Sequence, residues 1–125
     1  MNKDLFIGKR ILIVEDDTAS FVYLREVLSD TSAHLIHVDN GIDAIEICSQ
    51  INPDVVLMDI RLPKMDGYDA IVQIIALQPN KCIIAITANG LPEDRQKCLG
   101  LGCKEYLSKP VDSDLLMRTL TKYLQ

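Results

Sequence analysis

Residues 55–70 read VVLMDIRLPKMDGYDA, and this stretch carries the clearest signal of the fold. The four apolar residues at 55–58 are typical of a strand that is covered on both faces of a parallel sheet. Asp59 follows them directly, and Pro63 and Gly67 interrupt the chain before residues with helical spacing begin. We therefore expect a buried strand, a loop and a helix, with an acidic side chain at the carboxyl end of the strand.

The same pattern of strand and helix recurs on both sides of this stretch. Between the apolar runs, apolar residues return at helical spacing, as Phe21, Leu24 and Leu28 do. The alternation predicts an α/β fold, with a doubly wound five-stranded parallel sheet and helices on both faces. At 125 residues the chain is too short for two ordinary domains, so we expect a single domain over residues 1–125. The expected strands are residues 11–14, 35–38, 55–58, 82–86 and 105–108.

The composition argues against several classes of function. The net charge of -5 and the lack of any run of Lys or Arg argue against nucleic-acid binding. The first ten residues lack the apolar core of a signal peptide, and no apolar stretch approaches the roughly 20 residues that cross a bilayer. We therefore expect a soluble, cytoplasmic protein without a membrane partner. The four cysteines form no CxxC pair, which fits small buried side chains in a reducing compartment better than a zinc site.

Polar side chains follow most of the predicted strands at the point where each strand ends. In a doubly wound sheet this edge holds the ligand site. Carboxylates packed together would repel one another unless a hard cation lay among them, and Mg2+ is the natural candidate. Two simpler interpretations stay open: an acidic turn that only stabilises a helix N-terminus, and an Asp59–Lys109 pair that is only a salt bridge. The strand-end residues are Glu15, Asp16, Asp17, Asp59, Thr87 and Lys109.

Four motifs in this order resemble the receiver domain of two-component response regulators, the family that includes the bacterial chemotaxis regulator. ILIVEDD at 11–17 resembles the acidic first turn of that family, and VVLMDIRLPKMDGYDA resembles its phosphorylation segment. AITAN at 85–89 resembles the switch-threonine segment, and KEYLSKPVD at 104–112 resembles the lysine segment. The resemblance covers residues 10–124. It implies a flavodoxin-like fold with strand order 2-1-3-4-5.

The resemblance also implies how the acidic residues act. It makes Asp59 the phosphoacceptor, Asp16 a direct Mg2+ ligand, and Glu15 a ligand that acts through a metal-bound water. Glu15 stands where many members of the family have Asp, and it keeps the charge on a longer side chain. The backbone carbonyl of Arg61 would be the third protein ligand. Asp17 lies one position beyond the usual acid pair, so we expect it only to cap a helix.

Three further residues acquire roles in a switch from the same resemblance. Lys109 would neutralise charge on the transferring phosphoryl oxygens, and the following Pro110 resembles the family's cis-proline. Thr87 would donate its hydroxyl to a phosphoryl oxygen and draw the next loop inward. Tyr106 would then move inward as well. This predicts a two-state element that added charge at Asp59 shifts.

The residue at position 61, an arginine, is relevant both to the lifetime of the phosphoryl group and to the choice between this family and other phosphate-handling folds. Together with Asn89 it resembles the positions that tune the lifetime of the phosphoryl group in the family. A haloacid dehalogenase-type phosphatase would need an acid at position 61, where this chain has Arg61. A nucleotide-binding module is also disfavoured, because no GxGxxG or GxxxxGK[ST] pattern follows a strand.

The resemblance implies a phosphorelay partner rather than a substrate. We expect a histidine kinase or a histidine phosphotransfer protein as donor, and a signalling switch with slow self-dephosphorylation rather than an enzyme. We expect the output to be partner binding or self-association through residues 91–124. The segment 102–111 resembles receivers attached to hybrid histidine kinases. A receiver fold that docks a partner without being phosphorylated remains the alternative.

Overall fold

The computed structural model describes residues 4–88 and 90–125 and contains one five-stranded parallel sheet. The strand order is β2-β1-β3-β4-β5, so the predicted flavodoxin-like order is confirmed. Each predicted strand range is correct to within one residue, and β3 and β4 end on Asp59 and Thr87 themselves. The strands are β1 (Arg10–Val14), β2 (His34–Val38), β3 (Val55–Asp59), β4 (Ile83–Thr87) and β5 (Glu105–Ser108).

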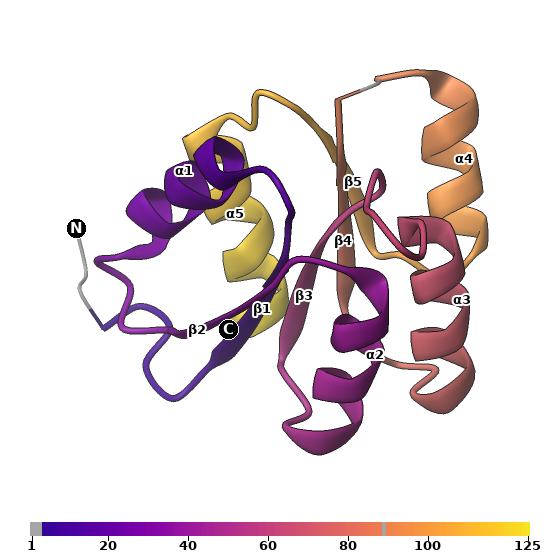
Figure 1. Ribbon diagram of the computed structural model, residues 1–125. Helices are drawn as coiled ribbons and strands as arrows, with labels where there is room; N and C mark the ends of the chain where they lie inside the picture. The colour runs from indigo at the N-terminus through magenta and orange to yellow at the C-terminus, as the bar shows by residue number, and fades with distance from the viewer. Residues whose placement is uncertain (1–3, 89) are drawn as a thin grey trace.

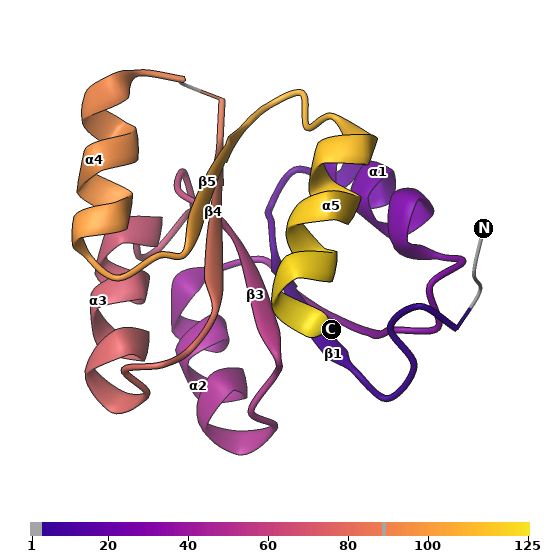
Figure 2. The same ribbon diagram turned by 180° about the vertical axis from the view of Figure 1, so that it is seen from behind.

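Helices cover both faces of the sheet, as the alternating pattern predicts. Figures 1 and 2 show α1 and α5 on one face and α2, α3 and α4 on the other. None of the helices in the described part of the chain is long and apolar enough to span a membrane. The helices are α1 (Thr18–Leu28), α2 (Gly41–Gln50), α3 (Gly67–Leu77), α4 (Pro92–Gly100) and α5 (Ser113–Leu124).

Two separate hydrophobic cores explain why the central strands are continuously apolar. Alternate side chains of a strand point to opposite faces of its sheet. In β1, Leu12 and Val14 pack with α2 and α3, whereas Ile11 and Ile13 pack with α1 and α5. The strands β3 and β4 are buried along their whole length. Both faces are therefore apolar, and the polar residues are displaced to the ends of the strands.

Capping residues fix where four of the helices begin. The side chains of Asp17, Asn40, Asp66 and Asp112 each accept a hydrogen bond from a backbone N–H in the first turn of the following helix. The expected capping role of Asp17 is thus confirmed. α4 differs, because it begins at Pro92 after Leu91, whose side chain makes no capping hydrogen bond.

Gly67 allows α3 to start directly against the carboxyl end of β3. A Cβ atom at this position would lie 2.6 Å from Cα of Ile60 and 2.7 Å from the carbonyl oxygen of Asp59. Any side chain would therefore push the helix away from Asp59. Asp66 and Gly67 therefore start α3 and also allow it to lie close to the carboxyl end of β3.

Candidate functional site

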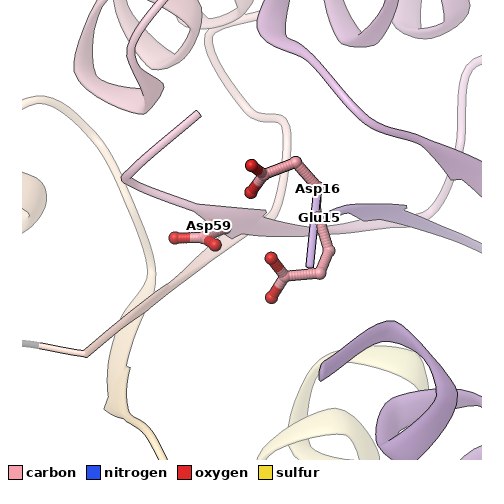
Figure 3. A group of neighbouring side chains, drawn as sticks. All are labelled: Glu15, Asp16 and Asp59. Carbon is pink, nitrogen blue, oxygen red and sulfur yellow. The ribbon is translucent and has the colours of Figure 1, made fainter. Parts of the chain in front are cut away.

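Three carboxylates meet at the carboxyl ends of β1 and β3, where the strand order of the sheet reverses. One oxygen each from Glu15, Asp16 and Asp59 lie within 4.8 Å of one another. Figure 3 shows Glu15 and Asp16 on the segment that follows β1, with Asp59 at the end of β3. Glu15 and Asp59 are 2% and 5% exposed, whereas Asp16 is open to solvent. The predicted convergence of acids is therefore confirmed.

Lys109 joins two of these acids. Its Nζ lies 2.7 Å from Oε1 of Glu15 and 3.0 Å from Oδ2 of Asp59. Its backbone N–H donates to the carbonyl oxygen of Thr87 at 2.8 Å, which fixes the chain after β5 against the end of β4. The peptide bond from Lys109 to Pro110 is cis, as the resemblance implied. Lys109 therefore bridges two strand ends instead of pairing with Asp59 alone.

Asp59 is held at both of its carboxylate oxygens. Lys109 binds Oδ2, and the backbone N–H of Arg61 donates to Oδ1 at 2.9 Å. Buried carboxylates are costly unless they have such partners. The two bonds fix the side chain in one orientation at the end of its strand.

The surroundings of Glu15 change the pH at which its carboxyl group is ionised. Burial raises the pKa of its carboxyl to about 7, and the neighbouring Asp59 adds to this rise. The hydrogen bonds from Lys109 and from the Asp17 N–H oppose it. Burial disfavours the charge of Lys109, but its bonds to Glu15 and Asp59 raise its pKa. Three acids thus face one ammonium group, and the site carries excess negative charge when all are ionised.

The donor set suits a hard divalent cation. Carboxylate oxygens are the ligands that Mg2+ prefers, and it usually keeps several waters. Asp16 offers an exposed carboxylate beside two buried ones, so the group is open on one side. Asp17 is directed elsewhere, because its carboxylate accepts from the Ser20 N–H, and this bond lowers its pKa.

A cavity of about 640 Å³ opens beside Asp16. Two of its walls are joined by a hydrogen bond from the Tyr68 hydroxyl to Oδ1 of Asp94, at 3.0 Å. This bond connects the start of α3 to α4. The cavity is lined by Asp16, Ile60, Arg61, Leu62, Pro63, Asp66, Tyr68, Thr87 and Asp94.

The two residues with predicted switch roles lie on neighbouring strands. Thr87 ends β4, is 3% exposed and lies opposite Ser108. Tyr106 lies opposite Ala85 and is already 8% exposed, packed in the core with α3 and α4. Their movement on phosphorylation stays a prediction. Asn89, the other position linked with the phosphoryl lifetime, lies outside the described residues.

Sequence reasoning missed two features around the acids. The Tyr68–Asp94 hydrogen bond joins residues 26 positions apart, and no strand-end pattern marks either one. The ring of His37 lies 2.8 Å from the carbonyl oxygen of Glu15 through Nε2. His37 belongs to β2, and only the register of β2 against β1 places it beside Glu15.

Comparison with known sequences identifies relatives that are much longer than this chain. The chain is 36% identical over 115 residues to the sensor histidine kinase RcsC of Escherichia coli K12. This alignment covers 92% of the chain and 12% of RcsC. It is 33% identical to hybrid signal transduction histidine kinase B of Dictyostelium discoideum, over 93% of the chain and 7% of that protein. The chain therefore corresponds to a small part of each of these kinases.

Solved structures agree in fold over nearly the whole chain. One of them is the receiver domain of sensor histidine kinase PA1611 from Pseudomonas aeruginosa PAO1, which has a magnesium ion coordinated in its active site cleft. It is 36% identical to this chain, with a TM-score of 0.86, and the match covers 94% of this chain and 98% of that one. The receiver domain of Saccharomyces cerevisiae Ssk1, crystallised with the phosphotransfer protein Ypd1, is 27% identical with a TM-score of 0.88, over 95% and 90% of the two chains. Residues 11–121 also match the family model of the response regulator receiver domain. With the acids at its strand ends and this match, the chain belongs to the response regulator receiver domain family.

Proposed function

We propose that this receiver domain, residues 1–125, accepts a phosphoryl group on Asp59 from a phosphohistidine in a Mg2+-dependent reaction. The observation that carries the proposal is the fixed carboxylate of Asp59. It is held by Lys109 and by the Arg61 N–H, and it faces two further acids. A nucleophile needs such fixed geometry in phosphoryl transfer, where catalysis is mainly positioning and electrostatics.

Mg2+ is the proposed cofactor: Asp16, Asp59 and the backbone carbonyl of Arg61 would hold it directly, and Glu15 would act through a metal-bound water. Support comes from the three clustered carboxylates and from the magnesium in the Pseudomonas receiver domain. When bound, the ion supplies positive charge that offsets the acids and the transferring phosphoryl oxygens. The exposed side of the cluster at Asp16 gives it a route of entry.

The transfer forms one bond and breaks one. An oxygen of Asp59 attacks phosphorus, the O–P bond of an acyl phosphate forms, and the P–N bond of the phosphohistidine breaks. The donor imidazole leaves and takes a proton from solvent. Lys109 lies 3.0 Å from Asp59 and is placed to stabilise negative charge on the transferring oxygens. Later attack by water on the same phosphorus returns Asp59 and phosphate, so the domain switches itself off slowly. It acts as a signalling module with this intrinsic chemistry rather than as an enzyme.

The proposed donor is a histidine kinase or a histidine phosphotransfer protein. Two relatives bear the name of histidine kinases, and a similar yeast receiver was crystallised with the phosphotransfer protein Ypd1. We place the reaction in the cytoplasm. The four cysteines form no CxxC pair and no disulfide framework can be inferred from their spacing, which fits a reducing compartment.

The output follows from the residues next to the acids. We propose that the Thr87 hydroxyl binds a phosphoryl oxygen, that the loop after β4 moves inward, and that Tyr106 adjusts behind it. Thr87 lines the cavity together with Asp94 of α4. The face that responds is then residues 91–124, through which the domain binds a downstream protein or a second copy of itself.

Uptake of phosphate from acetyl phosphate tests this function. With Mg2+ the intact mass should rise by one phosphoryl group, and the product should be cleaved by hydroxylamine, as acyl phosphates are. Addition of EDTA should abolish uptake. A protein that binds Mg2+ but stays unmodified, by acetyl phosphate and by a phosphorylated phosphotransfer protein alike, would favour the docking module that works without phosphorylation.

A further inference from the structure

Glu15 is attached to the protein at each of its polar groups. Its backbone N–H donates to the carbonyl oxygen of Val38 at 3.1 Å, and its own carbonyl oxygen lies 2.8 Å from Nε2 of His37. Oε1 binds Lys109, and Oε2 accepts from the Asp17 N–H at 3.2 Å. Two of these four attachments come from β2, which pairs with β1 up to Val14. The edge strand thus continues to hold the chain beyond the last ladder pair.

The His37 ring is itself fixed in place. It stacks on Phe21 of α1 with the ring centroids 3.7 Å apart and an angle of 8° between the planes. On the same helix, the guanidinium of Arg25 lies 5.5 Å from the centroid of the Phe21 ring. Stacked aromatic rings restrict one another to few orientations. The ring nitrogen therefore points at Glu15 because the stack holds the ring in that orientation.

The partner of His37 determines the direction of the hydrogen bond. A carbonyl oxygen can only accept, so Nε2 must carry a proton and donate it to Glu15. This holds for the neutral Nε2–H tautomer as well as for the charged ring. The bond fixes the carbonyl of the peptide that joins Glu15 to Asp16. The orientation of that peptide sets the direction in which the Asp16 side chain leaves the backbone.

We propose that His37 is a positioning residue for the Mg2+ site. Its ring, stacked on Phe21, holds the Glu15–Asp16 peptide so that the exposed Asp16 carboxylate stays within reach of Asp59. The inference rests on the proposed Mg2+-dependent function and adds a residue that never touches the metal. Ordering an exposed side chain when the metal binds lowers the affinity for the metal. A backbone that is already held in the right orientation reduces this loss of conformational entropy and so favours binding.

Two substitutions separate the hydrogen bond from the stack. His37→Phe keeps a flat ring for Phe21 and removes the donor. His37→Gln restores an amide N–H of similar reach. We expect Mg2+ binding, measured by calorimetry on the full chain, to weaken roughly threefold to tenfold in His37→Phe, the range of one hydrogen bond. His37→Gln restores the donor but not the stack, so it should recover part of the loss.

Further measurements distinguish positioning from a general loss of structure. Thermal unfolding in EDTA should change little in His37→Phe, because His37 is exposed. Exchange of the Glu15 amide, whose N–H donates to the carbonyl oxygen of Val38, should accelerate. Phosphate uptake from acetyl phosphate should need more Mg2+ for half its maximal rate, with the rate at saturating Mg2+ unchanged.

Asp16→Asn in the same titration keeps the two proposals separable. If Asp16→Asn binds Mg2+ as the wild type does, the metal site itself is wrong. If Asp16→Asn loses affinity while His37→Phe keeps that of the wild type, the metal site stands and the positioning role of His37 is overturned. Equal weakening by His37→Phe and His37→Gln would also overturn it, since the donor would then not matter.

Discussion

Glu15 belongs to the group of acids and helix α4 lines the cavity beside it, yet the two are held in opposite ways. Glu15 is 2% exposed and has partners at both backbone groups and both carboxylate oxygens. α4 starts without a side-chain cap and buries only Cys98 among its residues. It is tied to α3 by the Tyr68–Asp94 hydrogen bond and by Lys97, whose Nζ lies 4.0 Å from the centroid of the Tyr68 ring. The acid at the site is thus held by many hydrogen bonds, whereas the neighbouring helix is held by few buried side chains.

This difference suits a switch. A site that binds a metal and fixes a nucleophile benefits from rigidity, because its side chains lose their conformational entropy when the protein folds and not when the ligand binds. A surface that reports the chemistry must instead have two arrangements of similar free energy. Segments with few buried apolar side chains are the ones that open most easily.

The largest effect is expected from a substitution within the group of acids at Glu15, Asp16 and Asp59. Asp16→Asn removes a proposed direct ligand, and Mg2+ affinity should fall by at least about tenfold. Asp17→Asn should change it far less, because Asn caps a helix as well as Asp does. Calorimetric titration of both variants provides the measurement. Equal losses would mean that the acid pair has been assigned one residue out of register.

Thr87→Ala should separate the chemistry from the response. Uptake of phosphate should persist, because Asp59 and Lys109 remain. Beryllofluoride, which stands in for the phosphoryl group, should then cause much smaller changes in amide exchange over residues 91–124 than in the wild type. Thr31→Ala is the control, since Thr31 is also a buried hydroxyl but bonds to Leu28. In the wild type, changes confined to α1 and α2 would rule out the proposed coupling.

The raised pKa of Glu15 predicts how stability depends on pH in EDTA. The unfolded chain should release this proton near the ordinary value of 4.5, and the folded chain near 7. Between these values the folded state binds more protons, so the free energy of unfolding should fall as the pH rises. Glu15→Gln should flatten that part of the profile. Chemical denaturation across the interval measures it, and an unchanged slope in the variant would place the effect on another group.

The smallest effect concerns the tie between α3 and α4. Tyr68→Phe removes one hydroxyl and keeps the ring beneath Lys97, so it should cost about 0.5–1.5 kcal/mol of stability. Exchange of the α4 amides should accelerate. Tyr23→Phe is the matched control, because its hydroxyl bonds to the carbonyl oxygen of Val111, 2.6 Å away and outside α4. Similar α4 exchange in both variants would show that the Tyr68 bond does not hold this helix.

Much of this structure could be predicted from the sequence because the signals are local. The short apolar runs around Leu57 and Ile84 are rich in Ile and Val and bounded by turn residues, which favours strands covered on both faces, and parallel strands bring their carboxyl ends to one edge. The meeting of Asp59 with Glu15 and Asp16 follows from that rule together with the adjacency of β1 and β3, which the resemblance to receiver domains implied.

The remaining features depend on register and side-chain orientation, which no local pattern specifies. Lys109 could have reached only Asp59, but the chain after β5 lets it reach Glu15 as well. The sequence predicts that Glu15 keeps the charge of the usual Asp and acts through a metal-bound water, whereas its raised pKa arises from burial that only the packed fold creates. The positions of His37 and Tyr68 depend in the same way on how neighbouring elements are offset.

The most direct test of the proposed phosphoacceptor is to identify the residue that carries the phosphoryl group. After reaction with acetyl phosphate and Mg2+, borohydride should reduce the acyl phosphate, and peptide mass spectrometry should find homoserine at position 59 alone. Asp66→Asn, which keeps the cap of α3, should give the same result, and Asp59→Asn should give no homoserine. Homoserine at Asp16, Asp17 or Asp66 in the wild type, or phosphate uptake by Asp59→Asn, would contradict the central claim that Asp59 is the acceptor.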